Sequence, residues 1–188
     1  DEDDIIDASE LDSDIGNIYP GKGNDTVTNA TSKHTIITGP GEDNISGEKF
    51  GYALWNATQA VIINLKENWS EDGFGTRDTI SGVETIHGSS FGDTMYGSEN
   101  YEKYFVNGGN NTIDGGGGND RASYAPGRGP STNFEITYID GSAHVKGENT
   151  LDILKNVSTI EFMDDAKIFS VDNENGNIRL GETFYGTE

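Results

Sequence analysis

Residues 115–123 read GGGGNDRAS, which is a glycine-rich turn, an acidic residue and three residues with strand character. Two other stretches share this layout: residues 20–28 read PGKGNDTVT, and residues 38–46 read TGPGEDNIS. In each stretch an Asp precedes a small or apolar residue by two positions. Glycine suits the turn because it has no Cβ and adopts backbone angles that are closed to other residues. The sequence therefore predicts a nine-residue unit of one turn and one short strand.

The unit recurs in register over two parts of the chain, 18–54 and 86–122. Two units would make one full coil, so turns that are two units apart should stack on the same edge, ~4.8 Å from each other. The spacing therefore predicts two arrays of stacked coils with an interruption between them. The predicted core positions, one unit apart, are Ile18, Val27, Ile36, Ile45 and Leu54 in the first array, and Ile86, Met95, Tyr104, Ile113 and Ala122 in the second.

The repeat pattern divides the chain into five predicted segments. Repeat coils span 1–54, and an insertion, read as a surface loop or an extra hairpin, spans 55–76, where the period lapses. A second repeat array spans 77–124, and a cap with several strand-like pieces spans 125–171. We expect the polar tail, 172–188, to be loosely held.

The cap is predicted to be antiparallel. Residues 134–139 and 143–146 are strand-like runs that flank Asp140-Gly141, a common hairpin turn signal. A stack of coils needs such a cover, because a bare terminal coil exposes both its core and its unpaired main chain. The sequence as a whole therefore predicts an all-β fold.

The composition points to a cationic partner. The formal net charge of the 188 residues is −21, and the chain contains no cysteine. Nucleic acid and anionic membrane surfaces carry the wrong sign of charge for such a chain, whereas divalent cations would relieve its self-repulsion. Without cysteine there are neither disulfides nor thiolate metal sites. No apolar run approaches the length of a membrane span, and we predict none.

The stacked turns offer hard oxygen ligands. Asp25 and Asp43 are two units apart, so their carboxylates should face one gap between turns, together with main-chain carbonyls freed by the glycines. Calcium takes six to eight such oxygens, and the sequence predicts several calcium ions. The predicted metal-site residues are Gly21, Gly23, Asp25, Gly39, Gly41, Asp43, Asp93, Gly108, Asn111, Gly116, Gly118 and Asp120.

Two further pairs have the same spacing but depart from the pattern. Asp93 is two units from Asn111, and Asp120 is two units from Glu102. Asn lacks the charge of Asp, and Glu is longer than the pattern expects. We therefore rank the Asp25–Asp43 pair as the best site, with these pairs after it.

His34 and Tyr52 stand where the repeat has its acidic residue, so no full calcium site is predicted on their edge. The histidines lie far apart in the sequence, and none forms a paired metal-binding spacing. The sequence also contains no Gly-x-Ser-x-Gly nucleophile turn and no phosphate-binding loop. We therefore predict that the chain is not an enzyme.

The three glycine-rich units resemble the hemolysin-type calcium-binding repeats of RTX (repeats-in-toxin) proteins, which are secreted by bacteria. Residues 75–98, GTRDTISGVETIHGSSFGDTMYGS, look like the connecting repeats of long RTX domains. Residues 149–171, NTLDILKNVSTIEFMDDAKIFSV, are similar to the segment that often closes them. The resemblance implies a right-handed parallel β-roll or β-helix, calcium between stacked turns, and type I export to the extracellular space.

Two functions follow from the resemblance. The first is a calcium-binding module of a larger secreted protein, which folds on calcium binding after export and supports neighbouring domains. The alternative is a calcium-dependent polysaccharide-binding module attached to a carbohydrate-active enzyme. Trp55, Trp69, Tyr101 and Tyr104 could offer stacking surfaces for sugar rings, although the period places Tyr104 in the core.

Overall fold

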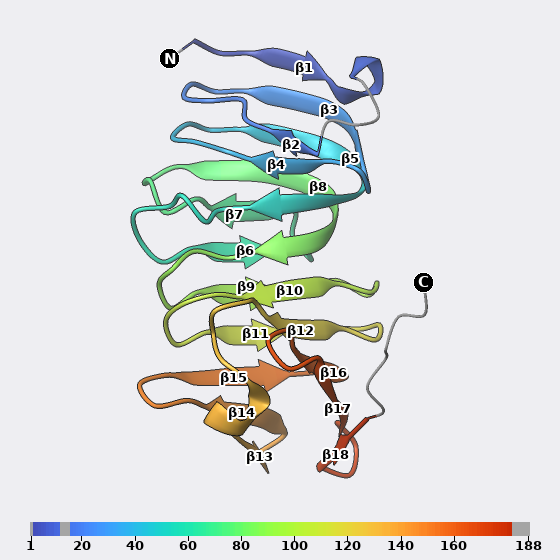
Figure 1. The fold of residues 1–188 in the computed structure, drawn as a ribbon. Coiled ribbons are helices and arrows are strands. Elements are labelled where there is room, and N and C mark those ends of the chain that lie inside the picture. Colours follow the sequence, from blue (N-terminus) through green and yellow to red (C-terminus); the bar gives the residue numbers. More distant parts are fainter. Residues whose placement is uncertain (1, 12–15, 182–188) are drawn as a thin grey trace.

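The short runs that follow each turn form strands, and these strands make up nearly all of the regular structure. The computed structural model describes residues 2–11 and 16–181 (Figure 1). Within these ranges, eighteen strands join into one mixed sheet, and two short 3-10 helices, Ala8–Glu10 (η1) and Ser131–Asn133 (η2), are the helical elements. The prediction of an all-β fold is confirmed.

One series of parallel strands, the Val27 ladder, carries the repeats that begin with PGKGNDTVT. Val27 pairs with Ile45, and Met95 pairs with Ile113, in each case at the predicted spacing of two units. The strands of this ladder are β1 (Ile5–Asp7), β3 (Thr26–Thr31), the first half of β5 (Asn44–Ala53), the first half of β8 (Arg77–His87), β9 (Thr94–Tyr96), β11 (Thr112–Asp114) and β15 (Leu151–Lys155).

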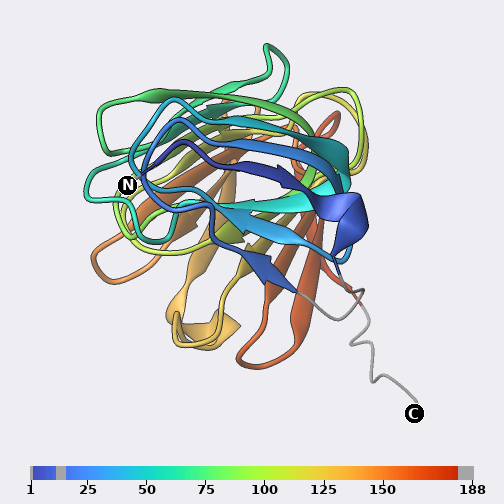
Figure 2. The ribbon, with the colours of Figure 1, turned by 90° about the horizontal axis from the view of Figure 1, so that it is seen from above.

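A second parallel series, the Ile36 ladder, encloses the core from the other side (Figures 1 and 2). Ile18 pairs with Ile36, and Tyr104 pairs with both Ile86 and Ala122, again at a spacing of two units. Its strands are β2 (Asn17–Ile18), β4 (Thr35–Ile37), the second halves of β5 and β8, β10 (Lys103–Val106), β12 (Arg121–Tyr124) and β16 (Thr159–Phe162).

The register of the Ile36 ladder differs from the prediction at Tyr52. Tyr52, and not Leu54, pairs with Ile36 and Ile86, and its side chain is fully buried. The prediction that Tyr52 occupies an acidic turn position is therefore wrong. The physical reason is that β5 continues through the expected turn as one strand. Its pairing with β8 shifts in register between Ser46 and Gly51, so the chain reaches Tyr52 with fewer residues than a full repeat would use.

The insertion is part of the sheet. Its strands β6 (Ile62–Asn64) and β7 (Trp69–Glu71) form an antiparallel hairpin. β7 then pairs antiparallel with β8, while β6 pairs parallel with β9. The hairpin thus continues the Val27 ladder where the repeat lapses, and it is one reason why the sheet is mixed.

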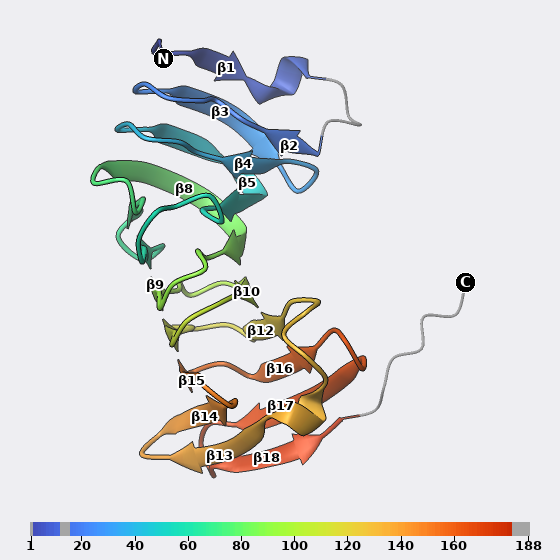
Figure 3. The ribbon, with the colours of Figure 1, turned by 60° about the vertical axis from the view of Figure 1, so that its left-hand side comes forward.

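The C-terminal cap combines both kinds of pairing, at the end opposite to β1 (Figure 3). β15 and β16 extend the parallel ladders, and antiparallel strands then join them. Asp140 (φ 49°) and Gly141 (φ 81°) make the hairpin turn, as predicted. The added strands are β13 (Glu135–Ile139), β14 (Ser142–Lys146), β17 (Lys167–Asp172) and β18 (Asn177–Leu180).

The predicted polar tail contains β18, which pairs with β17 of the cap. Residues 182–188 of that tail lie outside the described residues, as do residue 1 and residues 12–15 of the predicted N-terminal segment. The ten predicted core positions are all buried: Ile18, Val27, Ile36, Ile45, Leu54, Ile86, Met95, Tyr104, Ile113 and Ala122.

Candidate functional site

A row of acidic side chains runs along the stack, just before the strands of the Val27 ladder. The main-chain N–H of Asp25 donates to Asp43 Oδ1 at 2.8 Å, and the N–H of Asp43 donates to Asp78 Oδ1 at 3.1 Å. Each side chain thus holds the turn that precedes it in the stack. We call this row the acidic column; its members are Asp4, Asp25, Asp43, Asp78, Asp93 and Asp152, with the neutral Asn111 between the last two.

The predicted Asp25–Asp43 pair is brought together at the N-terminal part of this column. Both side chains are buried, with exposed fractions of 1% and 2%. The Oδ2 atom of each carboxylate is buried without a hydrogen-bond partner. Burial raises the pKa of Asp43 to about 7, and the nearby Asp78, Asp25 and Asp72 add to the rise. An unpartnered, buried carboxylate oxygen calls for a proton or a cation.

The turns that carry this pair stack with their main chains in direct contact. A Cβ at Gly39 would overlap the carbonyl oxygen of Gly21, and a Cβ at Gly41 would overlap that of Gly23. The carbonyls of one turn therefore face the next turn, as the sequence predicted. Gly23 also donates its N–H to the carbonyl of Pro40 at 3.1 Å. These carbonyls and the two free Oδ2 atoms are hard oxygen donors, the type of ligand that calcium takes.

The Asp93–Asn111 pair is also brought together, but its donors differ. Asp93 accepts the N–H of Ser89 at 2.7 Å on Oδ2, and the hydroxyl of Ser89 at 2.5 Å on Oδ1. The side-chain amide of Asn111 donates to the carbonyl of Gly108 at 3.1 Å and to Asp152 Oδ1 at 2.8 Å. Both side chains are therefore satisfied by the protein itself.

Glu102 and Asp120 meet before strands of the Ile36 ladder. The N–H of Glu102 donates to Asp120 Oδ1 at 2.7 Å, and Asp120 Oδ2 is buried without a partner. Burial raises the pKa of Asp120 to about 7. Gly116 and Gly118 stack on the carbonyls of the turn before, as Gly39 and Gly41 do. The acidic residue with the free oxygen is again the one that follows a glycine-rich turn.

Sequence reasoning missed Asp78 and Asp152, which are fully buried members of the column. Neither follows a glycine-rich turn of the expected form, yet both precede an apolar ladder residue by two positions, Ile80 and Leu154. The signal that could have found them is therefore the Asp-x-apolar spacing without the glycines.

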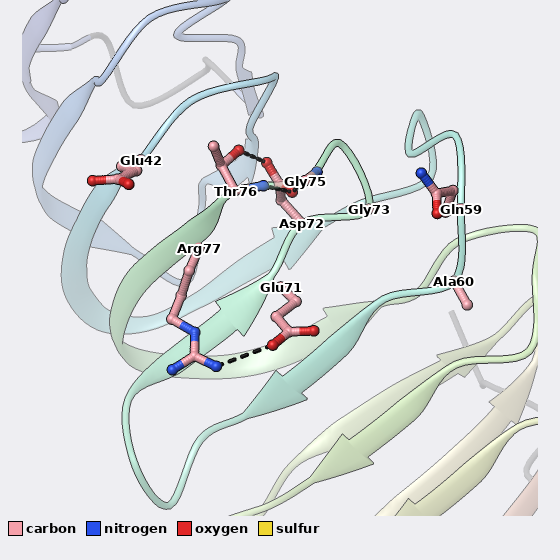
Figure 4. A pocket seen from close by; sticks show the side chains of 9 residues that line it. All are labelled: Glu42, Gln59, Ala60, Glu71, Asp72, Gly73, Gly75, Thr76 and Arg77. Atoms are coloured by element: carbon pink, nitrogen blue, oxygen red, sulfur yellow. Dashed lines mark hydrogen bonds and ion pairs between the residues drawn. The ribbon is translucent and has the colours of Figure 1, made fainter.

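The insertion contacts the Gly39–Asp43 turn directly. Thr76 accepts the N–H of Gly41 at 3.2 Å, and its own hydroxyl donates to Asp72 at 2.5 Å. A polar pocket of about 480 Å³ lies beside this contact, with the Arg77–Glu71 ion pair at 3.0 Å on one side (Figure 4). The lining residues are Glu42, Gln59, Ala60, Glu71, Asp72, Gly73, Gly75, Thr76 and Arg77.

The aromatic residues considered for sugar binding are partly covered. The guanidinium of Arg77 lies 4.0 Å from the ring centre of Trp69, and Trp55 meets His87 edge to face at 5.2 Å. Tyr104 is buried in the core, as its period predicted. Trp55 and Tyr101 remain exposed, at 42% and 40%. Of the four aromatic residues considered, these two keep exposed rings.

Neither a protein-family model nor a curated protein matches this chain. Across residues 2–11 and 16–181, three or more His, Cys, Asp or Glu side chains are nowhere grouped so that they alone could hold a metal ion. A cation between the turns would therefore depend on main-chain carbonyls as well as on carboxylates. Within the same ranges, the helices are too short and too polar to span a membrane.

Proposed function

We propose that this chain is a non-enzymatic RTX-type calcium-binding module with a right-handed parallel β-roll, which folds when calcium binds. One observation carries the proposal: the Oδ2 atoms of Asp25 and Asp43 are buried and unpartnered, and the carbonyls of one glycine-rich turn face the next turn. The two-unit register of the parallel pairs also supports it.

In this proposal the residues of the two turns hold the ion. Carboxylate oxygens of Asp25 and Asp43 and main-chain carbonyls of the glycine-rich turns would supply its ligands, and the ion would supply the positive charge that the buried carboxylates lack. Calcium accepts such irregular sets of oxygens, whereas magnesium demands near-ideal octahedral geometry and holds its water tightly. Calcium is therefore the cation that the turns favour.

Calcium binding would then drive folding. A ligand that binds only the folded state stabilises it by RT ln(1 + [L]/Kd), about 1.4 kcal/mol for each site when calcium is tenfold above Kd. The net charge of −21 opposes the folded state in the absence of cations. A module of this kind would complete its folding after export, in calcium-rich extracellular surroundings, where it would support its neighbouring domains.

The test is a calcium titration followed by circular dichroism, with magnesium as the control cation. We expect strand content and the unfolding temperature to rise with calcium well before they respond to magnesium. A chain that is fully folded in excess chelator, with an unfolding temperature that calcium does not change, would overturn the proposal.

A further inference from the structure

The acidic side chains before the strands fall into two groups, according to what their second oxygen contacts. In Asp25, Asp43 and Asp120 that oxygen, Oδ2, is buried and has no hydrogen-bond partner. In Asp78, Asp93, Glu102 and Asp152 both oxygens accept hydrogen bonds from the protein. The chain itself therefore distinguishes turns that need an external positive charge from turns that do not.

In the second array, a serine four residues before the acidic residue makes the difference. Ser89 donates both its N–H and its hydroxyl to Asp93, and Ser98 donates both groups to Glu102. In the turns that end at Asp25, Asp43 and Asp120, this position is Gly21, Gly39 and Gly116. Glycine has no hydroxyl to offer, and the second carboxylate oxygen is left free.

Beside the insertion, a core tyrosine takes the same role. The hydroxyl of Tyr52 donates to Asp78 Oδ2, while Ser70 and Thr38 reach the same oxygen at 3.4 Å. All four side chains are fully buried. The register shift that brings Tyr52 into the core is thus also what supplies a donor to Asp78.

At the cap, Asp152 has its own donors as well. Tyr124 donates its hydroxyl to Asp152 Oδ2 at 3.0 Å, and the guanidinium of Arg128 lies 3.5 Å from the same oxygen. Arg128 brings a full positive charge to the last carboxylate of the column. This end of the stack is therefore also closed by groups of the chain itself.

We propose that these donors determine which turns require a cation. The turns 20–25, 38–43 and 115–120 take the cations, whereas the central block, residues 62–106, is ordered without them. The reason is that a buried carboxylate costs little once hydrogen bonds satisfy both oxygens, and much more when one oxygen is left free. This inference rests on the proposed calcium-dependent folding, and it names the residues that limit calcium to part of the stack.

The test is hydrogen–deuterium exchange of the whole chain, in excess chelator and in calcium. We expect strands β6 to β10 to be protected in both conditions, and β3 and the first half of β5 to gain at least about tenfold protection only in calcium. Equal gains in the central block and in β3 would overturn the inference while leaving calcium-dependent folding intact. Rapid exchange of the central block in chelator would overturn it too, and no gain anywhere would instead refute the proposed function.

Variants of Ser89 and Tyr52 test the donors themselves. Ser89→Ala should speed exchange of β9 in chelator about tenfold, whereas Ser90→Ala, at the exposed neighbouring serine, should not. Tyr52→Phe should do the same for β7 and β8, because it removes the hydroxyl that donates to Asp78 Oδ2. Equal exchange in Ser89→Ala and Ser90→Ala would contradict the role assigned to Ser89. Unchanged exchange of β7 and β8 in Tyr52→Phe would contradict the role assigned to Tyr52.

Discussion

The main-chain N–H of Asp25 donates to the carboxylate of Asp43, two repeat units later, at 2.8 Å. This hydrogen bond uses one oxygen of Asp43 to hold a turn and leaves the other oxygen buried and free. Asp43 thus has a structural role that needs no ion, and a second oxygen that the protein leaves without a partner. A substitution that separates the two roles is therefore informative.

Asp43→Asn should lower the stability of the folded chain in calcium but not in chelator. The amide oxygen can still accept the N–H of Asp25, but the buried charge is gone. We expect a loss of about 1–3 kcal/mol of stability and of one bound ion in calcium, and equal or higher stability in chelator. Urea unfolding and a calcium count by titration calorimetry measure both effects.

Glu42→Gln is the matched control, because it removes the same charge from the exposed neighbouring residue. We expect it to change stability by less than about 0.5 kcal/mol in either condition. If Asp43→Asn and Glu42→Gln gave the same calcium stoichiometry, Asp43 would not be a ligand.

Gly39→Ala should be strongly destabilising in calcium and in chelator alike. The new Cβ would overlap the carbonyl oxygen of Gly21, and because that oxygen belongs to the main chain it cannot rotate away. We expect a loss of about 3 kcal/mol, measured by urea unfolding. Gly16→Ala is the control, since a Cβ there meets no atom within 4 Å; a loss as large as that of Gly39→Ala would show that the stacking of the turns is not the cause.

The calcium-free protein should become less stable as the pH rises from 5 to 7.5. Burial raises the pKa of Asp43 and Asp120 to about 7 and that of Asp78 to about 6, all from 3.8. Between pH 4 and 7 the folded chain therefore holds protons that the unfolded chain has lost, and this contribution to stability disappears as the pH passes the folded pKa values. We expect a loss of about 2 kcal/mol, measured by urea unfolding in chelator.

Calcium should reverse this trend, because the ion requires deprotonated carboxylates. The same unfolding series in saturating calcium is thus the control. Stability in chelator that rises between pH 5 and 7.5 would contradict the burial of uncompensated carboxylates in the stack.

His87 should remain neutral to a lower pH than an ordinary histidine. Its ring stacks on Phe105 at 4.2 Å, and burial lowers its pKa from 6.5 to about 4, with the charge of Lys103 adding to the effect. The unfolded chain binds the proton first as the pH falls, so His87 contributes stability that is lost between pH 6.5 and 4. NMR titration of the His87 ring measures this directly; a midpoint near 6.5 in the folded protein would contradict the stacking.

The two-unit register could be predicted from sequence, because a single spacing, Asp-x-apolar, expresses both the turn and the inward-facing strand position. Val27, Ile45 and Met95 follow that spacing, and Ile113 follows it with Asn111 in place of the Asp. Tyr52 could not be placed in this way, because its position depends on a strand that continues through the expected turn. Local residue preference does not decide whether a chain turns or continues; packing against the next strand does.

Only part of the candidate site could be predicted from the sequence, for a similar reason. The pattern identified Asp25, Asp43 and Asp120, which end glycine-rich turns. The difference between their free oxygens and the satisfied oxygens of Asp78 and Asp152 depends on Tyr52 and Tyr124, which lie 26 and 28 residues away from them in sequence. Contacts of that separation exist only once the stack has formed.

The acidic column also gives the stack a direction. The main-chain N–H of each turn donates to an acceptor that lies later in the sequence. That of Asp4 donates to the carboxylate of Asp25, and that of Asp25 donates to the carboxylate of Asp43. A chain that emerges with its C-terminus first would present every acceptor before the turn that needs it, and each new coil could dock on a finished template. In a chain that emerges with its N-terminus first, the acceptor that holds each turn would emerge only after that turn.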